Sequence, residues 1–437
     1  MRNGWGGAGA PGRLGQVTGV AALVTVLGLL AGCTQTSNTQ AGPTGSTGPT
    51  TATGTTRSPS THPTTRSTTP SQPPARVHIA APEEGSPANP ITVTATSGAL
   101  KSVDVAIPGG GSLQGTFGSG HRAWSSTGQL DFGRSYAVTA TAANAAGAVS
   151  TTKGSVSTVT PGTLVFPQLT PAAGLSDIGV GQPLRVDFVQ SPDDTQAIAP
   201  TDRAAIQRKL AVTVNPPQPG AWYWISSNIV DYRPKAYWQP GTTIKLTAGI
   251  YGASFGHGAF GKLTRTATYT VHATMIAVAD GHAENMKIYD SADLTNPIKT
   301  MNISLGSTAN GTPTHSGIHV VVTVEKHNPY IMNSCTYGLC PPDPGAYIAK
   351  EYNAVRISDD GEFVHTNLNS IGSQGSSNVS HGCVNLNSAD GKWFYEHFKP
   401  GDVVIVNNSG GPKLPLGDLW GDWSLPWSVW SAGNATG

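Results

Sequence analysis

Two segments, Phe363-Val-His-Thr366 and Ser380-His-Gly-Cys-Val-Asn385, decide the fold and the chemistry of the C-terminal part of the chain, and fourteen residues separate His365 from the second segment. A cysteine attacks as the thiolate rather than as the thiol, and a neighbouring histidine stabilises that thiolate as an ion pair. His365 ends a predicted strand, and His381 lies two residues before Cys383. Either histidine could therefore be the partner of a nucleophilic Cys383.

The glycine before the cysteine supports this interpretation, but other interpretations remain open. Gly382 allows an unusual backbone conformation and a close approach of substrate, so the N–H groups around Cys383 could converge on a developing oxyanion. A single cysteine is often only a small buried hydrophobe, and a lone histidine is often only a satisfied polar group. His365, His381 and Cys383 could also ligate zinc, although these three residues have no Cys-x-x-Cys or His-x-x-x-His spacing among them.

Outward from the motif, residues 273–408 are predicted to form a mostly β domain with one or two helices. The apolar run 319–324 is continuous, which predicts a buried strand. Ser388 could cap a helix over about 389–398. Shorter apolar runs that are typical of strands lie at 275–278, 286–289 and 403–406.

Two further β domains are predicted before it, at 77–161 and 162–272. In both, apolar residues alternate with small or polar ones, as at 91–96, and turn residues separate the runs. Several short strands in each domain favour Ig-like β-sandwiches, from pattern alone. Trp222 and Trp224 share one face of a predicted strand, where they are either core aromatics or a platform for sugars.

Residues 1–33 are predicted to be a signal peptide, because a positively charged start precedes an apolar run, 20–31, that is too short to span a membrane comfortably. The ending Leu30-Ala-Gly-Cys33 resembles the bacterial lipobox, which implies cleavage before Cys33 and a lipid on its sulfur. The mature lipoprotein would be extracytoplasmic, anchored to the outer face of the cytoplasmic membrane in the cell wall. The alternative is an ordinary signal peptide with an incidental cysteine.

Composition limits the remaining possibilities. Residues 34–76 are predicted to be a disordered linker, because 21 of these 43 residues are Ser or Thr and none is Val, Ile, Leu or aromatic. The chain of 437 residues carries a net charge of +1, so it has no basic surplus for binding nucleic acid. Only 12% of its residues are charged and 54 are glycine, which excludes a coiled coil or a long helical bundle.

The spaced motif of His365 and Ser380-His-Gly-Cys-Val-Asn385 resembles the signature of the L,D-transpeptidases, the YkuD-type cysteine enzymes of bacterial cell walls. The segment 311–314 resembles one that these domains carry well before the cysteine. Segments 332–338 and 345–347 resemble the substrate-covering lid of the mycobacterial members. A lipobox, two Ig-like domains and a catalytic domain are likewise the mycobacterial arrangement. The resemblance implies an enzyme that needs no cofactor and no metal.

The resemblance also implies catalytic roles. Cys383 would be the nucleophile, and His365 would be its general base or ion-pair partner. The backbone carbonyl of Thr366 would orient the histidine. The backbone N–H groups of His381, Gly382 and Cys383 would bind the oxyanion.

A substrate pocket under the lid is implied as well. Tyr337 and Tyr347 would line this pocket, with Met332 nearby. Asn385 would shape the turn and reach the substrate, and Ser380 belongs to the same substrate-binding set.

Two features depart from the family pattern. Asn369 stands near the position where related enzymes often carry Trp, so the pocket wall would be smaller and more polar, which puts donor affinity and β-lactam reactivity in doubt. Cys335 and Cys340 lie five residues apart in the lid. Outside the cell they can form a small-loop disulfide that would stiffen the lid; the alternative is two free thiols.

The implied reaction is a two-step acyl transfer. Cys383 would attack a tetrapeptide stem at the diaminopimelate L-centre and expel D-Ala, and a diaminopimelate amine on a neighbouring stem would then take the acyl group to give a 3→3 cross-link. The implied partners are peptidoglycan stem peptides, the membrane through the N-terminal lipid, and β-lactams of the carbapenem type as acylating inhibitors. Alternatives are a wall L,D-carboxypeptidase or endopeptidase that uses the same Cys-His site, and a non-catalytic wall-binding lipoprotein.

The C-terminal tail, residues 409–437, places four Trp at helix-like intervals between Trp420 and Trp430, although Pro426 interrupts them. This pattern favours a strap that packs on the catalytic domain or on its neighbour. A contact with a partner or with a membrane is the alternative.

Overall fold

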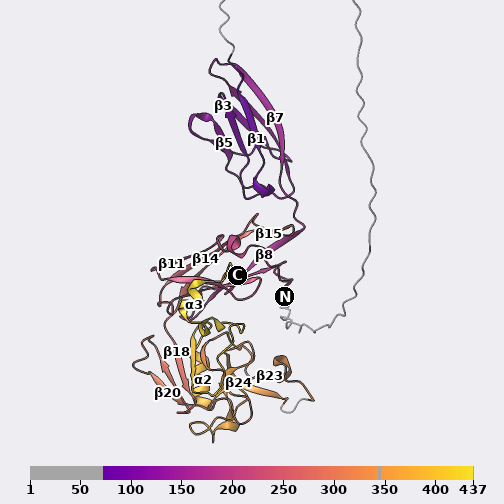
Figure 1. The fold of residues 1–437 in the computed structure, drawn as a ribbon. Helices are drawn as coiled ribbons and strands as arrows, with labels where there is room; N and C mark the ends of the chain where they lie inside the picture. Colours follow the sequence, from indigo (N-terminus) through magenta and orange to yellow (C-terminus); the bar gives the residue numbers. More distant parts are fainter. Residues whose placement is uncertain (1–71, 343–345, 437) are drawn as a thin grey trace, which may run out of the picture. The chain divides into compact units, whose positions relative to one another are not determined.

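The computed structural model describes residues 72–342 and 346–436, and Figure 1 shows their fold. The predicted signal peptide, Cys33 and almost all of the predicted linker lie outside the described residues. The last linker residues are described, and the Asn144 side chain donates hydrogen bonds to the carbonyl oxygens of Gln72 and Pro73. Within the described ranges, the helices are too short or too polar to cross a membrane.

The first described domain is a sandwich of two antiparallel sheets, with strand orders β1-β2-β5-β4 and β3-β6-β7. Alternation along the strands turns Leu100, Trp124 and Tyr136 into the space between the sheets, where each is nearly fully buried. Its strands are β1 (Arg76–Ala80), β2 (Thr92–Thr96), β3 (Ala99–Ala106), β4 (Gly115–Phe117), β5 (Ala123–Ser126), β6 (Ser135–Ala143) and β7 (Val149–Ser157).

The second domain is a larger sandwich, with strand orders β12-β13-β10-β8-β16-β15 and β11-β14-β17-β9. Phe188, Trp238 and Tyr269 are fully buried in its core. Its elements are β8 (Thr163–Thr170), β9 (Asp177–Ile178), β10 (Leu184–Val189), α1 (Arg203–Gln207), β11 (Leu210–Asn215), β12 (Gly220–Trp224), β13 (Ile229–Pro234), β14 (Thr243–Gly249), β15 (Ser254–Gly256), β16 (Ala259–Gly261) and β17 (Thr264–Val271).

The third domain contains two sheets, with strand orders β20-β19-β18-β27-β21 and β22-β24-β25-β26; β23 pairs with β24. Both sheets and the helix α2 contribute to one core, in which Ala277, Val364, Val384 and Phe394 are fully buried. Its elements are β18 (Ile276–Asp280), β19 (Asn285–Tyr289), β20 (Lys299–Asn302), β21 (Gly317–Val320), β22 (Thr323–Val324), β23 (Tyr330–Asn333), β24 (Ile348–Arg356), β25 (Phe363–Thr366), β26 (Val384–Leu386), α2 (Ser388–His397) and β27 (Val403–Asn407).

Two local predictions, a single strand over 319–324 and a helix cap at Ser388, are wrong. The apolar run 319–324 forms two strands instead of one, because β21 pairs with β27 in one sheet and β22 pairs with β24 in the other. The chain therefore crosses between the sheets within that run. The cap of α2 is Asn387 rather than Ser388, since the Asn387 side chain accepts a hydrogen bond from the N–H of Asp390 at 3.0 Å.

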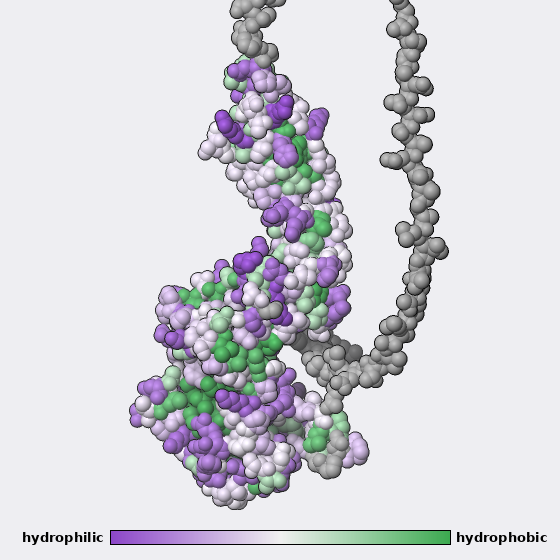
Figure 2. All heavy atoms as spheres, viewed as in Figure 1, coloured by the Kyte–Doolittle hydropathy of each residue, from purple (hydrophilic) through white to green (hydrophobic). Residues whose placement is uncertain are grey.

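The tail, with its helix α3 (Trp427–Ala432), packs on the second domain. The Trp430 indole N–H donates to the carbonyl oxygen of Ala221, and the Tyr223 ring stacks on Trp430 at 5.1 Å. Trp224 is buried in the core beneath, as the core-aromatic interpretation expects. Figure 2 shows hydrophobic side chains gathered at the surface near α3 and β18.

The second and third domains also share a core. Ile276 and Val403, from the third domain, belong to the buried cluster of the second. The Gly179 N–H donates to the carbonyl oxygen of Pro400, and a Cβ at Gly179 would lie 2.0 Å from the carbonyl carbon of Gly401. Only glycine fits at such a close approach.

The fold-class prediction is confirmed. The described chain is mostly β, with Ig-like sandwiches followed by a β-rich domain that carries the single longer helix α2 among the described residues.

Candidate active site

Strand pairing brings His365 and Cys383 together. Strands β25 and β26 are parallel neighbours, with Val364 opposite Val384 and His365 opposite Asn385. Cys383 immediately precedes β26 and therefore lies beside His365, although the two are distant in sequence. Both residues line a cavity of about 530 Å³.

The imidazole of His365 is almost fully buried and has acceptors at one nitrogen. Its Nδ1 lies 3.2 Å from the carbonyl oxygen of Thr366 and 2.8 Å from Oε2 of Glu351. Burial alone would lower the pKa of His365, but hydrogen bonds with Cys383 and Glu351, and their charges, raise it from 6.5 to about 10. Because the Nδ1–H group donates to these acceptors, Nε2 is the ring nitrogen that can face Cys383.

Cys383 carries a free thiol with an apolar wall on one side. It is 7% exposed and packs in a small cluster with Met332, Ala354 and Phe363. Its Sγ also lies 3.8 Å from the carbonyl oxygen of Gly361. A sulfur that is fixed in this way and paired with an imidazolium suits nucleophilic attack.

The turn before the cysteine is held by side-chain hydroxyl groups. Ser380 Oγ donates to the carbonyl oxygen of Cys383 at 2.6 Å, and Thr314 Oγ1 donates to that of Gly382 at 2.8 Å. The N–H of Gly382 donates to Ser380 Oγ at 3.1 Å. This contact corrects the oxyanion prediction, because the Gly382 N–H is already used and the N–H groups of His381 and Cys383 remain as candidates.

Two family models and a curated relative match the sequence of the domains described above. A model described as the L,D-transpeptidase catalytic domain (YkuD) matches residues 274–406, and one described as a bacterial Ig domain matches residues 83–254. L,D-transpeptidase 2 of Mycobacterium tuberculosis is 36% identical over 346 residues, which cover 79% of this chain and 81% of the relative. The chain belongs to the L,D-transpeptidase family.

Two further proteins are similar to this L,D-transpeptidase. L,D-transpeptidase 5 of Mycobacterium tuberculosis is 29% identical over 80% of this chain and 74% of its own length. A solved L,D-transpeptidase in complex with imipenem is 28% identical and covers 56% of this chain and all of its own, with a TM-score of 0.45. The family predicted from the motif, and the enzyme class that goes with it, are confirmed by the matched domain and the first relative.

The pocket of this L,D-transpeptidase contains most of the predicted substrate-binding residues. The Tyr347 ring lies 5.4 Å from the His381 ring, and Asn385 is buried with no hydrogen-bond partner for its Oδ1 within the described part of the chain. The predicted residues that line the cavity are Tyr347, Asn369, Ser380, His381 and Asn385.

Tyr337 and Met332 lie behind the pocket wall rather than in it. The Tyr337 hydroxyl accepts a hydrogen bond from Nη2 of Arg356 at 2.7 Å, and its ring packs directly against Gly361. Met332 is 2% exposed, within the cluster around the cysteine. Both therefore pack around the nucleophile without lining the cavity, which corrects the expectation that Tyr337 lines the pocket.

The lid segment contains a disulfide between Cys335 and Cys340. Cys335 lies in the turn η3 (Ser334–Tyr337), where its N–H donates to Oδ1 of Asn333. The disulfide therefore closes a short loop that starts directly after β23.

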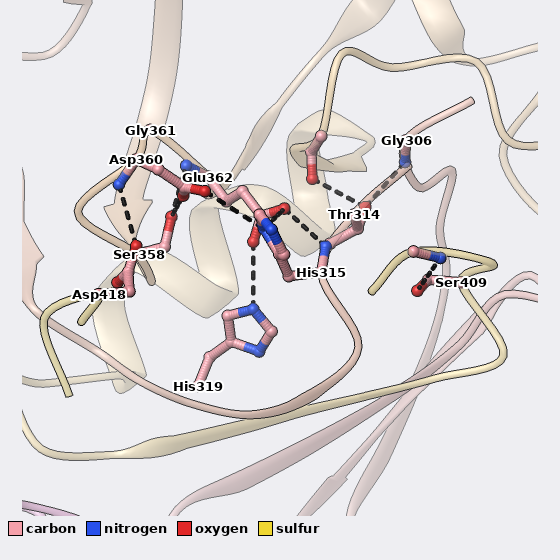
Figure 3. Close-up of polar contacts among 12 residues, drawn as sticks. Gly306, Thr314, His315, His319, Ser358, Asp360, Gly361, Glu362, Ser409 and Asp418 are labelled. Atoms are coloured by element: carbon pink, nitrogen blue, oxygen red, sulfur yellow. Dashed lines mark hydrogen bonds and ion pairs between the residues drawn. The ribbon is translucent and has the colours of Figure 1, made fainter. Parts of the chain in front are cut away.

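A buried polar cluster lies behind the cysteine turn, and sequence analysis missed it (Figure 3). Glu362 Oε1 accepts from the N–H of His315 at 2.7 Å and lies 3.2 Å from its Nδ1, while Oε2 lies 3.1 Å from Nε2 of His319. Burial raises the pKa of Glu362, but these donors lower it from 4.5 to about 2. The cluster adjoins Gly361 and Gly382, both of which contact or precede the nucleophile.

The zinc interpretation of the motif finds no support in the geometry. Within the described residues, the potential metal-ligand atoms that gather are those of His315, Asp360 and Glu362. The His365 ring instead has Glu351 at one nitrogen and Cys383 at the other.

Glu351 is the second residue that sequence analysis missed. It lines the cavity and is the acidic residue nearest to the histidine. A signal was present in the sequence, because Tyr347, Ala349 and Glu351 alternate along one strand and must share a face. The prediction of Tyr347 in the pocket could have been extended to Glu351.

Proposed function

We propose that this L,D-transpeptidase forms 3→3 cross-links between diaminopimelate residues of peptidoglycan through a thioester on Cys383. The observation that carries the proposal is the free Cys383 thiol beside a histidine that holds its proton, at the wall of a cavity large enough for a peptide stem. Such a pair supplies a thiolate without an external base.

The first step breaks an amide bond. The Cys383 thiolate attacks the carbonyl carbon that links the diaminopimelate L-centre to D-Ala, and a C–S bond forms. The N–H groups of His381 and Cys383 stabilise the oxyanion. The imidazolium of His365 then gives its proton to the leaving amine, and the C–N bond breaks.

The second step restores the enzyme. The side-chain amine of diaminopimelate on another stem attacks the thioester carbonyl, His365 takes the proton of that amine, and the C–S bond breaks. Water in place of the amine gives the carboxypeptidase reaction with the same groups. Asn385 belongs to the cavity wall that the donor stem would pass.

The test is incubation with a disaccharide-tetrapeptide, followed by mass spectrometry of the products and of the intact protein. We expect released D-Ala, a cross-linked dimer and a transient adduct on Cys383, and none of these with Cys383→Ala. Tripeptide without dimer would assign a carboxypeptidase instead. No adduct and no turnover, with wall binding retained by Cys383→Ala, would support the non-catalytic alternative.

We also propose that carbapenem-type β-lactams acylate Cys383, since a thiolate at an accessible cavity wall can open a strained amide ring. Asn369 lies in the same cavity wall as Cys383. Intact-mass analysis with a carbapenem should show one adduct per chain, and Asn369→Trp should change the rate of its formation. An unmodified mass after long incubation would contradict this proposal.

The proposed location is outside the cell, with a lipid on Cys33. Its support is the short apolar run and the lipobox-like ending Leu30-Ala-Gly-Cys33. In cells that express the full chain, a fatty-acid label should enter the protein and should be lost with Cys33→Ser. Equal labelling of both proteins would contradict a lipid at this residue.

A further inference from the structure

A carboxylate reaches the catalytic histidine from the neighbouring strand. Oε2 of Glu351 lies 2.8 Å from Nδ1 of His365, and the two side chains are 14% and 3% exposed. The carbonyl oxygen of Thr366 lies 3.2 Å from the same nitrogen. The carbonyl oxygen can orient the ring but carries no net charge. The carboxylate can orient the ring and also supply a negative charge next to it.

An irregularity in β24 brings Glu351 to this position. Tyr352 pairs with Thr366 and Val355 pairs with Val364, so β24 contains one residue more than β25 between these pairs. Such a β-bulge shifts the alternation of side chains by one residue. Glu351 therefore faces the cavity before the bulge, and Ala354 faces Cys383 after it.

Asn353 forms the bulge. Its φ of 55° is left-handed, a conformation that asparagine tolerates better than most residues. Its Nδ2 donates to Oγ1 of Thr366 at 3.0 Å, and its N–H donates to Oδ1 of Asn328 at 3.0 Å. The first contact joins the strand that carries Glu351 to the strand that carries His365, and the second joins it to the segment before β23.

The charged groups around the ring are few. Cys383 and Glu351 act on His365 by hydrogen bonding and by charge. Tyr347 and His381 line the same cavity, and the neighbour on β26 is the neutral Asn385. Glu351 is thus the carboxylate that faces the imidazole, opposite the thiol.

We propose that Glu351 is a positioning residue of the catalytic histidine: it holds Nδ1–H of His365 so that Nε2 faces Cys383, and its charge keeps the ring protonated for transfer to the leaving amine. The inference rests on the proposed function for its catalytic consequence. The effect of Glu351 on His365 itself does not depend on which substrate the enzyme uses.

The first experiment measures the histidine directly. In ¹⁵N-histidine NMR of the protein, with the His365 signals assigned by His365→Gln, the ring should titrate at a pH lower by about 1 unit or more in Glu351→Gln than in the wild type. Glu396→Gln, on the exposed face of α2, is the matched control and should leave the titration unchanged. An unchanged His365 titration in a folded Glu351→Gln would overturn the proposal.

The second experiment measures catalysis. The rate of adduct formation on Cys383 with a tetrapeptide donor is followed by intact mass as a function of pH. The basic limb of this profile, where the rate falls because His365 loses its proton, should lie at a lower pH in Glu351→Gln than in the wild type, with KM little changed. Glu351→Asp keeps the charge and should retain the wild-type position of that limb at a reduced rate. A uniform loss of rate with no displacement of the limb would assign Glu351 a purely structural role.

The two readouts separate this inference from the proposed function. If no donor ever forms an adduct but the His365 titration moves in Glu351→Gln, the cross-linking proposal fails and the link between Glu351 and His365 stands. If Glu351→Gln does not fold, the Glu351→Ala titration decides: a His365 ring that titrates at a lower pH than in the wild type supports the link, and an unchanged titration contradicts it.

Discussion

At the scale of single residues, two glutamates lie near the catalytic pair, Glu351 beside His365 and Glu362 behind the cysteine turn, and their surroundings differ. Glu351 is partly exposed at the cavity and has one histidine partner, whereas Glu362 is 7% exposed behind the cysteine turn and has two. Glu351 can therefore tune a proton that moves during catalysis. Glu362 accepts hydrogen bonds from fixed donors and is suited to hold the backbone at His315, next to the Thr314 that binds the Gly382 carbonyl oxygen.

Replacement of Glu362 should destabilise the fold. In Glu362→Gln one acceptor oxygen becomes a donor that faces the histidines, so the free energy of unfolding should fall by about 3 kcal/mol near neutral pH. Because the pKa of Glu362 is lowered from 4.5 to about 2, its contribution is present above pH 4.5 and is lost as the pH falls towards 2. Urea denaturation of both proteins from pH 7 to 3 measures the difference.

Glu396→Gln is the control, because its carboxylate is more than half exposed. It should unfold like the wild type across the same pH range. If the difference in free energy of unfolding between the wild type and Glu362→Gln stays constant down to pH 3, the buried carboxylate does not supply this stability.

At the scale of the element, β24 combines a bulge with the start of the lid hairpin. Its first half pairs with β23 and its second half with β25, and Asn353 lies at the change between them. The bulge places residues of both halves on the face that looks towards the nucleophile.

A change at Asn353 tests the bulge. Asn353→Ala should lose about 1 kcal/mol more stability than Asn353→Gly, because alanine is strained at a positive φ and glycine is not. Both variants lose the hydrogen bond to Thr366, which makes each the control for the other. Thermal melting together with the rate of adduct formation measures the effect, and equal melting of the two variants would be evidence against the left-handed conformation.

The lid disulfide gives a second test at this scale. Cys335→Ser combined with Cys340→Ser removes the disulfide, which should lower the free energy of unfolding by ~2 kcal/mol for so short a loop and should change the rate at which a donor acylates Cys383. Melting curves and acylation rates with and without a reductant, on the wild type and on the double variant, measure both effects. Unchanged kinetics and melting would mean that the disulfide does not stiffen the lid.

Sequence reasoning found the residues whose chemistry is local and missed those that depend on register. Cys383 and His365 could be recognised because a reactive thiol needs a nearby base, and the sequence motif contains both residues. The alternation with Tyr347 could place Glu351 at the pocket, but its contact with His365 depends on one extra residue in β24, which the sequence pattern does not show. The break of the run 319–324 into β21 and β22 was equally hidden, since a buried strand that changes sheets is apolar throughout.

At the scale of the whole molecule, a buried acidic pair lies where the tail meets the second domain. Asp231 is paired with Arg185 at 2.7 Å, while Asp422 of the tail is fully buried and its oxygens have no hydrogen-bond partner within the described residues. Burial and the charge of Asp231 raise the pKa of Asp422 well above 3.8. The folded protein therefore retains a proton that the unfolded chain releases.

Asp422→Asn should stabilise the protein at neutral pH. The wild type should lose stability as the pH rises above 3.8, because only the unfolded Asp422 ionises freely, whereas the variant has no such dependence. We expect a gain of about 1–2 kcal/mol at pH 7, from denaturation curves of both proteins between pH 4 and 8. A variant that is less stable than the wild type at every pH would show that the carboxylate is needed at this junction.

The shared core between the second and third domains limits how the protein can be shortened. A fragment confined to residues 273–408 would leave Ile276 and Val403 in water and would remove the surface on which the tail packs. The smallest soluble enzyme should therefore start near residue 162 and run to the C-terminus, so that the Ig-like neighbour is a structural part of the catalyst and more than a spacer.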